Sequence, residues 1–321
     1  MGFLDIFRKK QGKKDPIKRE ENEKLAENSI DRNNNNNFIN LNNEIDDLII
    51  REVLNVIQYH DNFEELKARA KIAAYNIGEE HIDLLPEYLT NKIDKTNDLE
   101  GKYENLGEWS MVVENSILMI IFSYREKGVH ILTEIAYGNT SLKLKAINLL
   151  VRLASEGVCT EKIVDDILNN IMDFDNDDKI TIFRFTSKLK GNNKIIALIQ
   201  HFYKEFLKAE DIERAYQTVV YLINVAQRCT RGHLNFLKEI AMDSKEIDLR
   251  KVIELKDGEK NIVNVGDIDE IIKIRAAITF YNMNREDEDI NNILIYCSKN
   301  YDNEKVKDEI KELLENKIVK L

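Results

Sequence analysis

Proline and glycine are scarce in this chain, which holds 2 Pro and 12 Gly among 321 residues. Sandwiches, barrels and doubly wound sheets need many tight turns, and tight turns draw heavily on these two residues. Long helices joined by short polar connections need few of them. The scarcity therefore excludes the turn-rich classes and predicts an all-α fold.

Cysteine is also scarce. Cys159, Cys229 and Cys297 are odd in number and far apart, no CxxC motif occurs, and no histidine lies near a cysteine at metal-ligand spacing. The most apolar run, "SILMIIF" at 116–122, is far shorter than the roughly 20 residues that span a bilayer. With no signal peptide before the body, we expect a cytoplasmic protein with free thiols, no metal and no cofactor.

Catalytic signatures are missing too, since no GxxxxGK[ST], GxGxxG, GxSxG or HExxH motif occurs. "DFDNDDK" at 173–179 alternates like a calcium loop, but the EF-hand pattern needs Gly sixth and Glu twelfth. Those places hold Asp178 and Arg184. We interpret the segment as an acidic turn that caps the next helix, and we predict that the protein is not an enzyme.

The net charge of −11 is unevenly distributed. Residues 1–19 carry a net charge of +5, which leaves −16 for residues 20–321. An acidic body disfavours sequence-independent nucleic-acid binding, which requires lysines and arginines that neutralise phosphates. We therefore expect no nucleic-acid partner, and the acidic body is compatible with a cationic protein partner.

The first ten residues, "MGFLDIFRKK", combine four large apolar side chains with a basic cluster. The apolar side chains span roughly 160° of a helical wheel, which is typical of a segment that docks on an interface. The seven residues of this tail are Phe3, Leu4, Ile6, Phe7, Arg8, Lys9 and Lys10. Three interpretations stay open: peripheral contact of residues 1–19 with the inner membrane face, docking on a partner or on the body, and disorder.

Residues 11–42 contain almost no apolar residue before Phe38 and predict a disordered linker. In residues 43–321 the apolar spacing is helical almost throughout. Asp257-Gly258, between two β-prone runs, predicts a small β-hairpin insert near 252–267. Helices are expected near residues 44–60, 63–78, 103–126, 129–137, 141–155, 160–172, 177–190, 193–208, 210–228, 231–242, 246–254, 268–282, 287–299 and 303–317.

The chain contains an internal repeat. "ILTEIAYGNTSLKLKAI" at 131–147 aligns without a gap on "FLKEIAMDSKEIDLRKV" at 236–252, and the second half recurs at 272–280, 212–220 and more weakly at 66–74. This pattern resembles the HEAT-repeat family of α-solenoids, in which a turn residue precedes a second helix that opens with a basic residue. Asn139 and Asp243 match the turn residue, while Lys145 and Arg250 match the basic residue.

The resemblance implies a right-handed α-solenoid over residues 43–321, with second helices that line a concave face and bind partners. Basic residues on the expected second helices form the candidate partner site: Lys143, Lys145, Arg214, Arg250 and Arg275. The competing interpretation is that most of them are solvated residues or part of a structural ladder between repeats.

The leading functional hypothesis is a non-enzymatic protein–protein interaction scaffold that binds a partner along the concave face. The alternative is an immunity-type or regulatory protein that neutralises a cationic partner, which the acidic body favours. A third class, a HEAT-like DNA-repair enzyme resembling the alkyl-purine DNA glycosylases, is disfavoured by the acidic body and by a single tryptophan, Trp109.

Overall fold

The computed structural model describes residues 32–89, 92–95, 99, 103, 106–228, 233–242, 250–254, 260–264 and 266–315. The chain divides into two compact units, Met1–Asp47 and Leu48–Leu321. The predicted docking tail, Phe3, Leu4, Ile6, Phe7, Arg8, Lys9 and Lys10, lies outside the described residues.

Helix α2 (Arg32–Ile57) is the first described element. The prediction of a disordered linker up to residue 42 was therefore wrong from Arg32 onward. Asparagine is a weak helix former, but extending an existing helix costs far less than nucleating one. The C-terminal half of α2 is anchored by buried residues, including Ile49, Val53 and Ile57, and the helix extends from there through the asparagine run.

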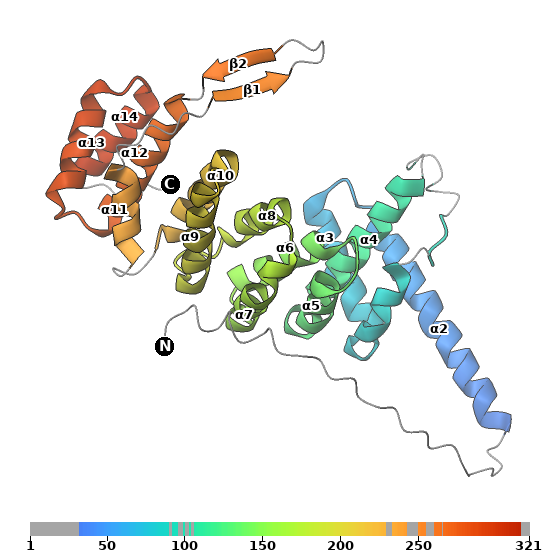
Figure 1. Ribbon diagram of the computed structural model, residues 1–321. Coiled ribbons are helices and arrows are strands. Elements are labelled where there is room, and N and C mark those ends of the chain that lie inside the picture. Colours follow the sequence, from blue (N-terminus) through green and yellow to red (C-terminus); the bar gives the residue numbers. More distant parts are fainter. Residues whose placement is uncertain are drawn as a thin grey trace, which may run out of the picture. The chain divides into compact units, whose positions relative to one another are not determined.

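Helices make up nearly all of the remaining described residues, which confirms the all-α class (Figure 1). They are α3 (Phe63–Ile77), η1 (Glu79–Leu89), α4 (Leu106–Ser123), η3 (Arg125–Gly128), α5 (Val129–Tyr137), α6 (Lys143–Ser155), α7 (Thr160–Asn170), η4 (Ile171–Asp173), α8 (Asn176–Thr186), α9 (Asn193–Lys208), α10 (Ile212–Ala226), α11 (Leu234–Met242), α12 (Gly266–Met283), α13 (Glu288–Asn300) and α14 (Glu304–Leu314). Within the described ranges, none of them combines the length and apolarity needed to cross a bilayer.

Asparagine and aspartate start many of these helices, which explains how the chain manages with so little glycine and proline. Their side-chain oxygens accept hydrogen bonds from backbone N–H groups of the first turn, which otherwise lack a partner. These N-cap residues are Asn62, Asp175, Asn192, Asp211, Asp287 and Asn303.

The calcium-like segment 173–179 is one of these caps. The side chain of Asp175 accepts a hydrogen bond from the Asp178 backbone N–H at 2.8 Å, which is the first-turn contact of α8. The acidic carboxylates here also lie at the positive end of the helix dipole. The interpretation as a capping turn is confirmed.

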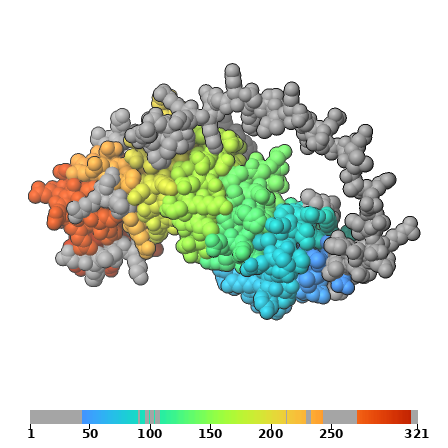
Figure 2. Space-filling model, turned by 90° about the horizontal axis from the view of Figure 1, so that it is seen from below, coloured from blue at the N-terminus to red at the C-terminus, as the bar shows by residue number. Residues whose placement is uncertain are grey.

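Packing within Leu48–Leu321 follows the order of the chain. Successive helices pair as α3–α4, α5–α6, α9–α10, α11–α12 and α13–α14. Each even-numbered helix also packs on the next one, from α4 through α6, α8, α10 and α12 to α14. The colours in Figure 2 accordingly follow one another in sequence order.

The core lies between these helices and is aliphatic with a few aromatic residues. Leu132, Ile147, Leu150, Phe183 and Leu222 have no exposed surface. Burying such a side chain contributes about 1.5–3 kcal/mol. Since one helical pair cannot cover its own apolar face, this burial depends on the neighbouring pairs.

Two short strands, β1 (Arg250–Glu254) and β2 (Lys260–Asn264), interrupt the helices between α11 and α12. They run antiparallel, with Val252 opposite Ile262, and they overlap the segment 252–267. The helix expected near 246–254 was wrong over β1. The repeat alignment favoured a helix there, but adjacent β-branched residues, Val252 and Ile253, favour a strand.

Candidate functional site

Three basic residues of the predicted partner site, Lys145, Arg214 and Arg275, form ion pairs between helices that are two apart in the chain. Lys145 Nζ on α6 donates to Glu114 Oε2 on α4 at 3.1 Å, across 31 residues. Arg275 Nη1 on α12 donates to Glu309 Oε2 on α14 at 2.6 Å, across 34 residues. Each pair therefore connects one even-numbered helix to the next.

Arg214 on α10 makes the most extensive contact of this kind. Its Nε and Nη2 donate to Asp177 Oδ1 at 3.1 and 2.8 Å, 37 residues earlier on α8. Its Nη1 donates to Asp211 Oδ2, the residue that caps α10, at 2.5 Å. These hydrogen bonds, with the one to Asp211 the stronger, raise the pKa of Arg214 above its ordinary value.

The odd-numbered helices carry matching contacts. Lys194 Nζ on α9 donates to Asp165 Oδ1, near the middle of α7, over 2.6 Å. Lys238 Nζ on α11 donates to Asp287 and Asp289, at the start of α13, over 2.8 Å each. The hydrogen bonds that the two lysines donate to these carboxylates raise the pKa of both lysines. We call the five residues concerned the ladder cations: Lys145, Lys194, Arg214, Lys238 and Arg275.

This geometry favours the ladder interpretation over a free basic strip. Lys143, which is not a ladder cation, lies with its Nζ 6.0 Å from the centre of the Phe174 ring. Arg250 is the first residue of β1, so its placement on a second helix was wrong, for the reason that made the 246–254 helix wrong. The structure therefore does not assemble the five predicted residues into one basic surface.

A different group of cations comes together at the C-terminal ends of α6 and α8. Arg152 lies in the last turn of α6, Arg184 lies in the last turn of α8, and Lys188 follows α8. Partial burial lowers the pKa of Lys188, and the positive charges of Arg152 and Arg184 lower it further. Within the described part of the chain, no carboxylate forms an ion pair with these three residues.

Helix α3 continues this group. The guanidinium of Arg152 lies over the ring of Phe63, 4.8 Å from its centre, and Phe63 is 43% exposed. Lys67 and Lys71 follow Phe63 at helical spacing along α3 and so lie on the same face. Both lysines lie close enough to Glu156, just after α6, to lower its pKa.

Glu156 is the carboxylate that the structure places within this group. It pairs with Arg125 of η3, and this hydrogen bond is the main cause of its lowered pKa. We define the cation cluster as Lys67, Lys71, Arg125, Arg152, Arg184 and Lys188. Arg125, Lys67 and Lys71 lie near Glu156, and Arg152 and Arg184 lie near Lys188, in a chain whose net charge is −11.

Sequence reasoning missed the cation cluster for a specific reason. A basic residue in the last turn of a helix is ordinarily explained by the negative end of the helix dipole. Arg152 and Arg184 each satisfy that explanation alone. Only the packing of α6 on α8 brings them close, and the spacing of the two residues in the sequence carries no sign of it.

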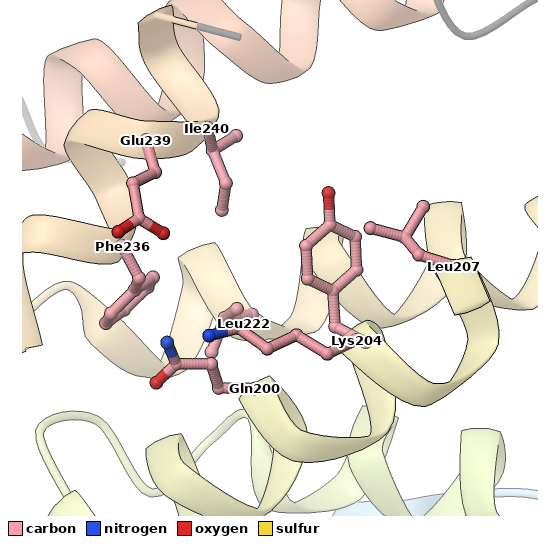
Figure 3. A pocket seen from close by; sticks show the side chains of 8 residues that line it. Gln200, Lys204, Leu207, Leu222, Phe236, Glu239 and Ile240 are labelled. Atoms are coloured by element: carbon pink, nitrogen blue, oxygen red, sulfur yellow. The ribbon is translucent and has the colours of Figure 1, made fainter.

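The structure also contains two hollows, which lie among the helices from α9 to α14. A groove of about 410 Å³ lies between α10, α12 and α14, with Val220, Ile223 and Ile272 as apolar lining and the Arg275–Glu309 pair at its wall. A smaller cleft of about 190 Å³ lies between α9, α10 and α11 (Figure 3). In the smaller cleft, Lys204 and Glu239 project from α9 and α11, over Leu222 and Phe236.

Among the described residues, no group of three or more His, Cys, Asp or Glu side chains has a metal-binding arrangement. His130 Nε2 contacts Asp83 Oδ1 at 2.9 Å, which links α5 to η1. Neither Cys159 nor Cys297 forms a disulfide bond within the described part of the chain, and Cys229 lies outside the described residues.

Comparisons of the chain with protein-family models, with curated proteins and with solved structures found no match.

Proposed function

We propose that this protein is a non-enzymatic protein–protein interaction scaffold, built as a right-handed HEAT-like α-solenoid, and that it binds its partner along the row of even-numbered helices. The observation that carries the proposal is the unbroken packing of α4, α6, α8, α10, α12 and α14, each on the next. Such a row is a long surface made of equivalent positions, which is how solenoid proteins bind extended partners.

The ladder cations support the solenoid arrangement. Contacts between even-numbered helices join residues that are 31, 34 and 37 positions apart. A nearly constant separation is expected when successive units repeat the same geometry. Since an exposed ion pair contributes about 0–1 kcal/mol, the ladder cations contribute more to the alignment of neighbouring units than to total stability.

The groove between α10, α12 and α14 suits a protein ligand. Its apolar lining offers surface for a side chain of the partner, and Asn224, Gln227 and the Arg275–Glu309 pair provide a polar border. Interfaces commonly combine a small apolar centre with a polar rim. The proposal places the partner in the cytoplasm, with the N-terminal tail as a peripheral contact at the inner membrane face.

The net charge of −11 supports the alternative, an immunity-type or regulatory protein that neutralises a cationic partner. The two hypotheses predict different partners. A neutralising protein binds one basic partner tightly, and its affinity falls steeply with salt. A HEAT-like DNA-repair enzyme remains the least favoured class. Binding DNA requires basic residues that neutralise phosphates, and Lys145, Arg214 and Arg275 already pair with carboxylates.

Site-specific photo-crosslinking in a lysate of the source cell tests the proposal. A photoreactive amino acid replaces Val220, which lines the groove, and in a matched control it replaces Glu205, which is exposed on α9. We expect one protein to be captured through position 220 and not through position 205. Equal capture at both positions, or no captured protein, would contradict a binding face on the even-numbered helices.

A further inference from the structure

We propose that the cation cluster is a recognition site for a short acidic peptide segment, rich in Asp and Glu, of the partner protein. This inference rests on the proposed function and adds a second contact site to it. The site consists of Lys67 and Lys71 on α3, Arg125 on η3, Arg152 on α6, and Arg184 and Lys188 at the end of α8.

The contrast with the ladder cations is the first argument. The chain contains 58 acidic and 47 basic residues, so carboxylates are plentiful, and the structure pairs each ladder cation with at least one of them. Arg152 and Arg184 instead lie close enough to Lys188 to lower its pKa, and none of the three pairs with a carboxylate among the described residues. Their mutual repulsion opposes folding, and an acidic ligand would relieve it.

Phe63 is the second argument. An exposed aromatic ring ordinarily contributes little to the stability of a protein. Here the centre of the Phe63 ring lies 4.8 Å from the guanidinium carbon of Arg152. A guanidinium that lies over a ring can still bind a carboxylate through two parallel hydrogen bonds from its N–H groups. The contact with Phe63 therefore limits the positions that Arg152 can take before a ligand arrives.

The size of the cluster and the charge around it favour a peptide over a nucleic acid or a membrane. Electrostatic interactions are screened over about 8 Å at physiological ionic strength. A short acidic peptide on the cluster therefore interacts mainly with its six cations. A long polyanion or an anionic bilayer also approaches the rest of this acidic chain, which over all 321 residues has a net charge of −11, and is repelled there.

Fluorescence anisotropy tests the inference with the full chain and a defined probe. The probe is a ten-residue peptide of Glu and Asp that carries a neutral dye, and the control peptide has Gln and Asn at the same positions. The cluster variant is Arg152→Gln with Arg184→Gln. The matched control is Lys145→Gln with Arg214→Gln, which removes the same charge from two ladder cations.

We expect the acidic peptide to bind, the control peptide not to bind, and the cluster variant to bind the acidic peptide about tenfold more weakly. The ladder variant should change the affinity less than about twofold. Glu156→Gln should strengthen binding, because it removes the paired carboxylate of the site. Circular dichroism of each variant shows whether it is folded, and Glu156→Gln keeps the test decisive if the cluster variant does not fold.

Equal weakening in the cluster and ladder variants would overturn the inference, since net charge alone would then explain binding. No binding of the acidic peptide, or tighter binding of a ten-nucleotide single-stranded DNA or of anionic vesicles than of the peptide, would also overturn it. If the peptide fails to bind while position 220 captures a partner, only this inference fails. If the peptide binds as expected while position 220 captures nothing, the proposed function fails.

Discussion

The same even-numbered helices carry two kinds of cations. Lys145 and Arg214 lie in the first turns of α6 and α10, and each pairs with a carboxylate of the preceding even-numbered helix. Arg152 and Arg184 lie in the last turns of α6 and α8, where the structure places cations next to cations. The two groups are the same residue types on equivalent elements, but only one group is neutralised.

The difference shows that a basic residue in this protein has to be interpreted together with its neighbours on adjacent helices. Paired cations link neighbouring helices, whereas crowded cations cost stability unless something outside the chain binds them. We therefore expect the largest effect on stability from a substitution in the buried core that supports both groups. The loss of one ladder pair should have a smaller effect, and the loss of one cluster cation the smallest.

The largest effect is expected from Phe183→Ala. Phe183 is fully buried in α8, and its ring centre lies 5.4 Å from that of Phe202 on α9. Truncating a buried phenylalanine lowers the free energy of unfolding by about 3–5 kcal/mol. The loss should weaken the packing of the helices that carry both groups of cations. Urea denaturation measures the loss. Phe63→Ala, at a ring that is 43% exposed, should cost less than about 1.5 kcal/mol, and an equal loss in both variants would contradict the burial pattern.

A ladder pair should have an intermediate effect. The double-mutant cycle of Arg214→Gln and Asp177→Asn should give a coupling energy of about 0.5–1 kcal/mol in favour of the pair, because the side chains are partly exposed. The coupling should shrink in high salt. Urea denaturation of the wild type, both single variants and the double variant measures it. A coupling energy of zero at low salt would show that the ladder contacts do not act as a stabilising pair.

The smallest effect, and one of opposite sign, is expected from Lys188→Gln. Burial and the neighbouring cations lower the pKa of Lys188 from its ordinary value of 10.5. A folded-state pKa below the unfolded-state value means that the charged form opposes folding at neutral pH. Removing the charge should therefore stabilise the protein by up to about 0.5 kcal/mol.

The pH dependence of that difference provides the check. As the pH rises from the lowered pKa of Lys188 towards 10.5, the folded wild type loses the proton before the unfolded chain does, so the wild type gains stability relative to Lys188→Gln. The stability difference, measured by denaturation at pH 7 and pH 10, should shrink. A destabilised Lys188→Gln variant at pH 7 would contradict the crowding of cations.

Much of the fold follows from local sequence. The helix expected over 193–208 agrees with α9 (Asn193–Lys208), because Asn192 caps its start and its apolar residues repeat with helical spacing. The capping role of the acidic turn at 173–179 was predicted for the same local reason, and the structure assigns it to Asp175. Two expectations failed where distant packing or backbone preference prevailed: residues 32–42 are helical, and Arg250–Glu254 is a strand.

The candidate site was less predictable. Sequence reasoning selected Lys145, Arg214 and Arg275 from their places on second helices and left open whether they bind a partner or form a ladder. The structure pairs all three with carboxylates. It brings Arg152, Arg184 and Lys188 together instead, although no motif connects them in the sequence.

By itself the sequence determined the all-α class, the starts of most helices and the lack of turn-rich architecture, because capping, helical periodicity and the scarcity of Pro and Gly act over a few residues. Only the tertiary structure decided which cations are neutralised and which are crowded. That outcome depends on contacts between helices some 30 residues apart, and electrostatic interactions depend on distance in space and not along the chain.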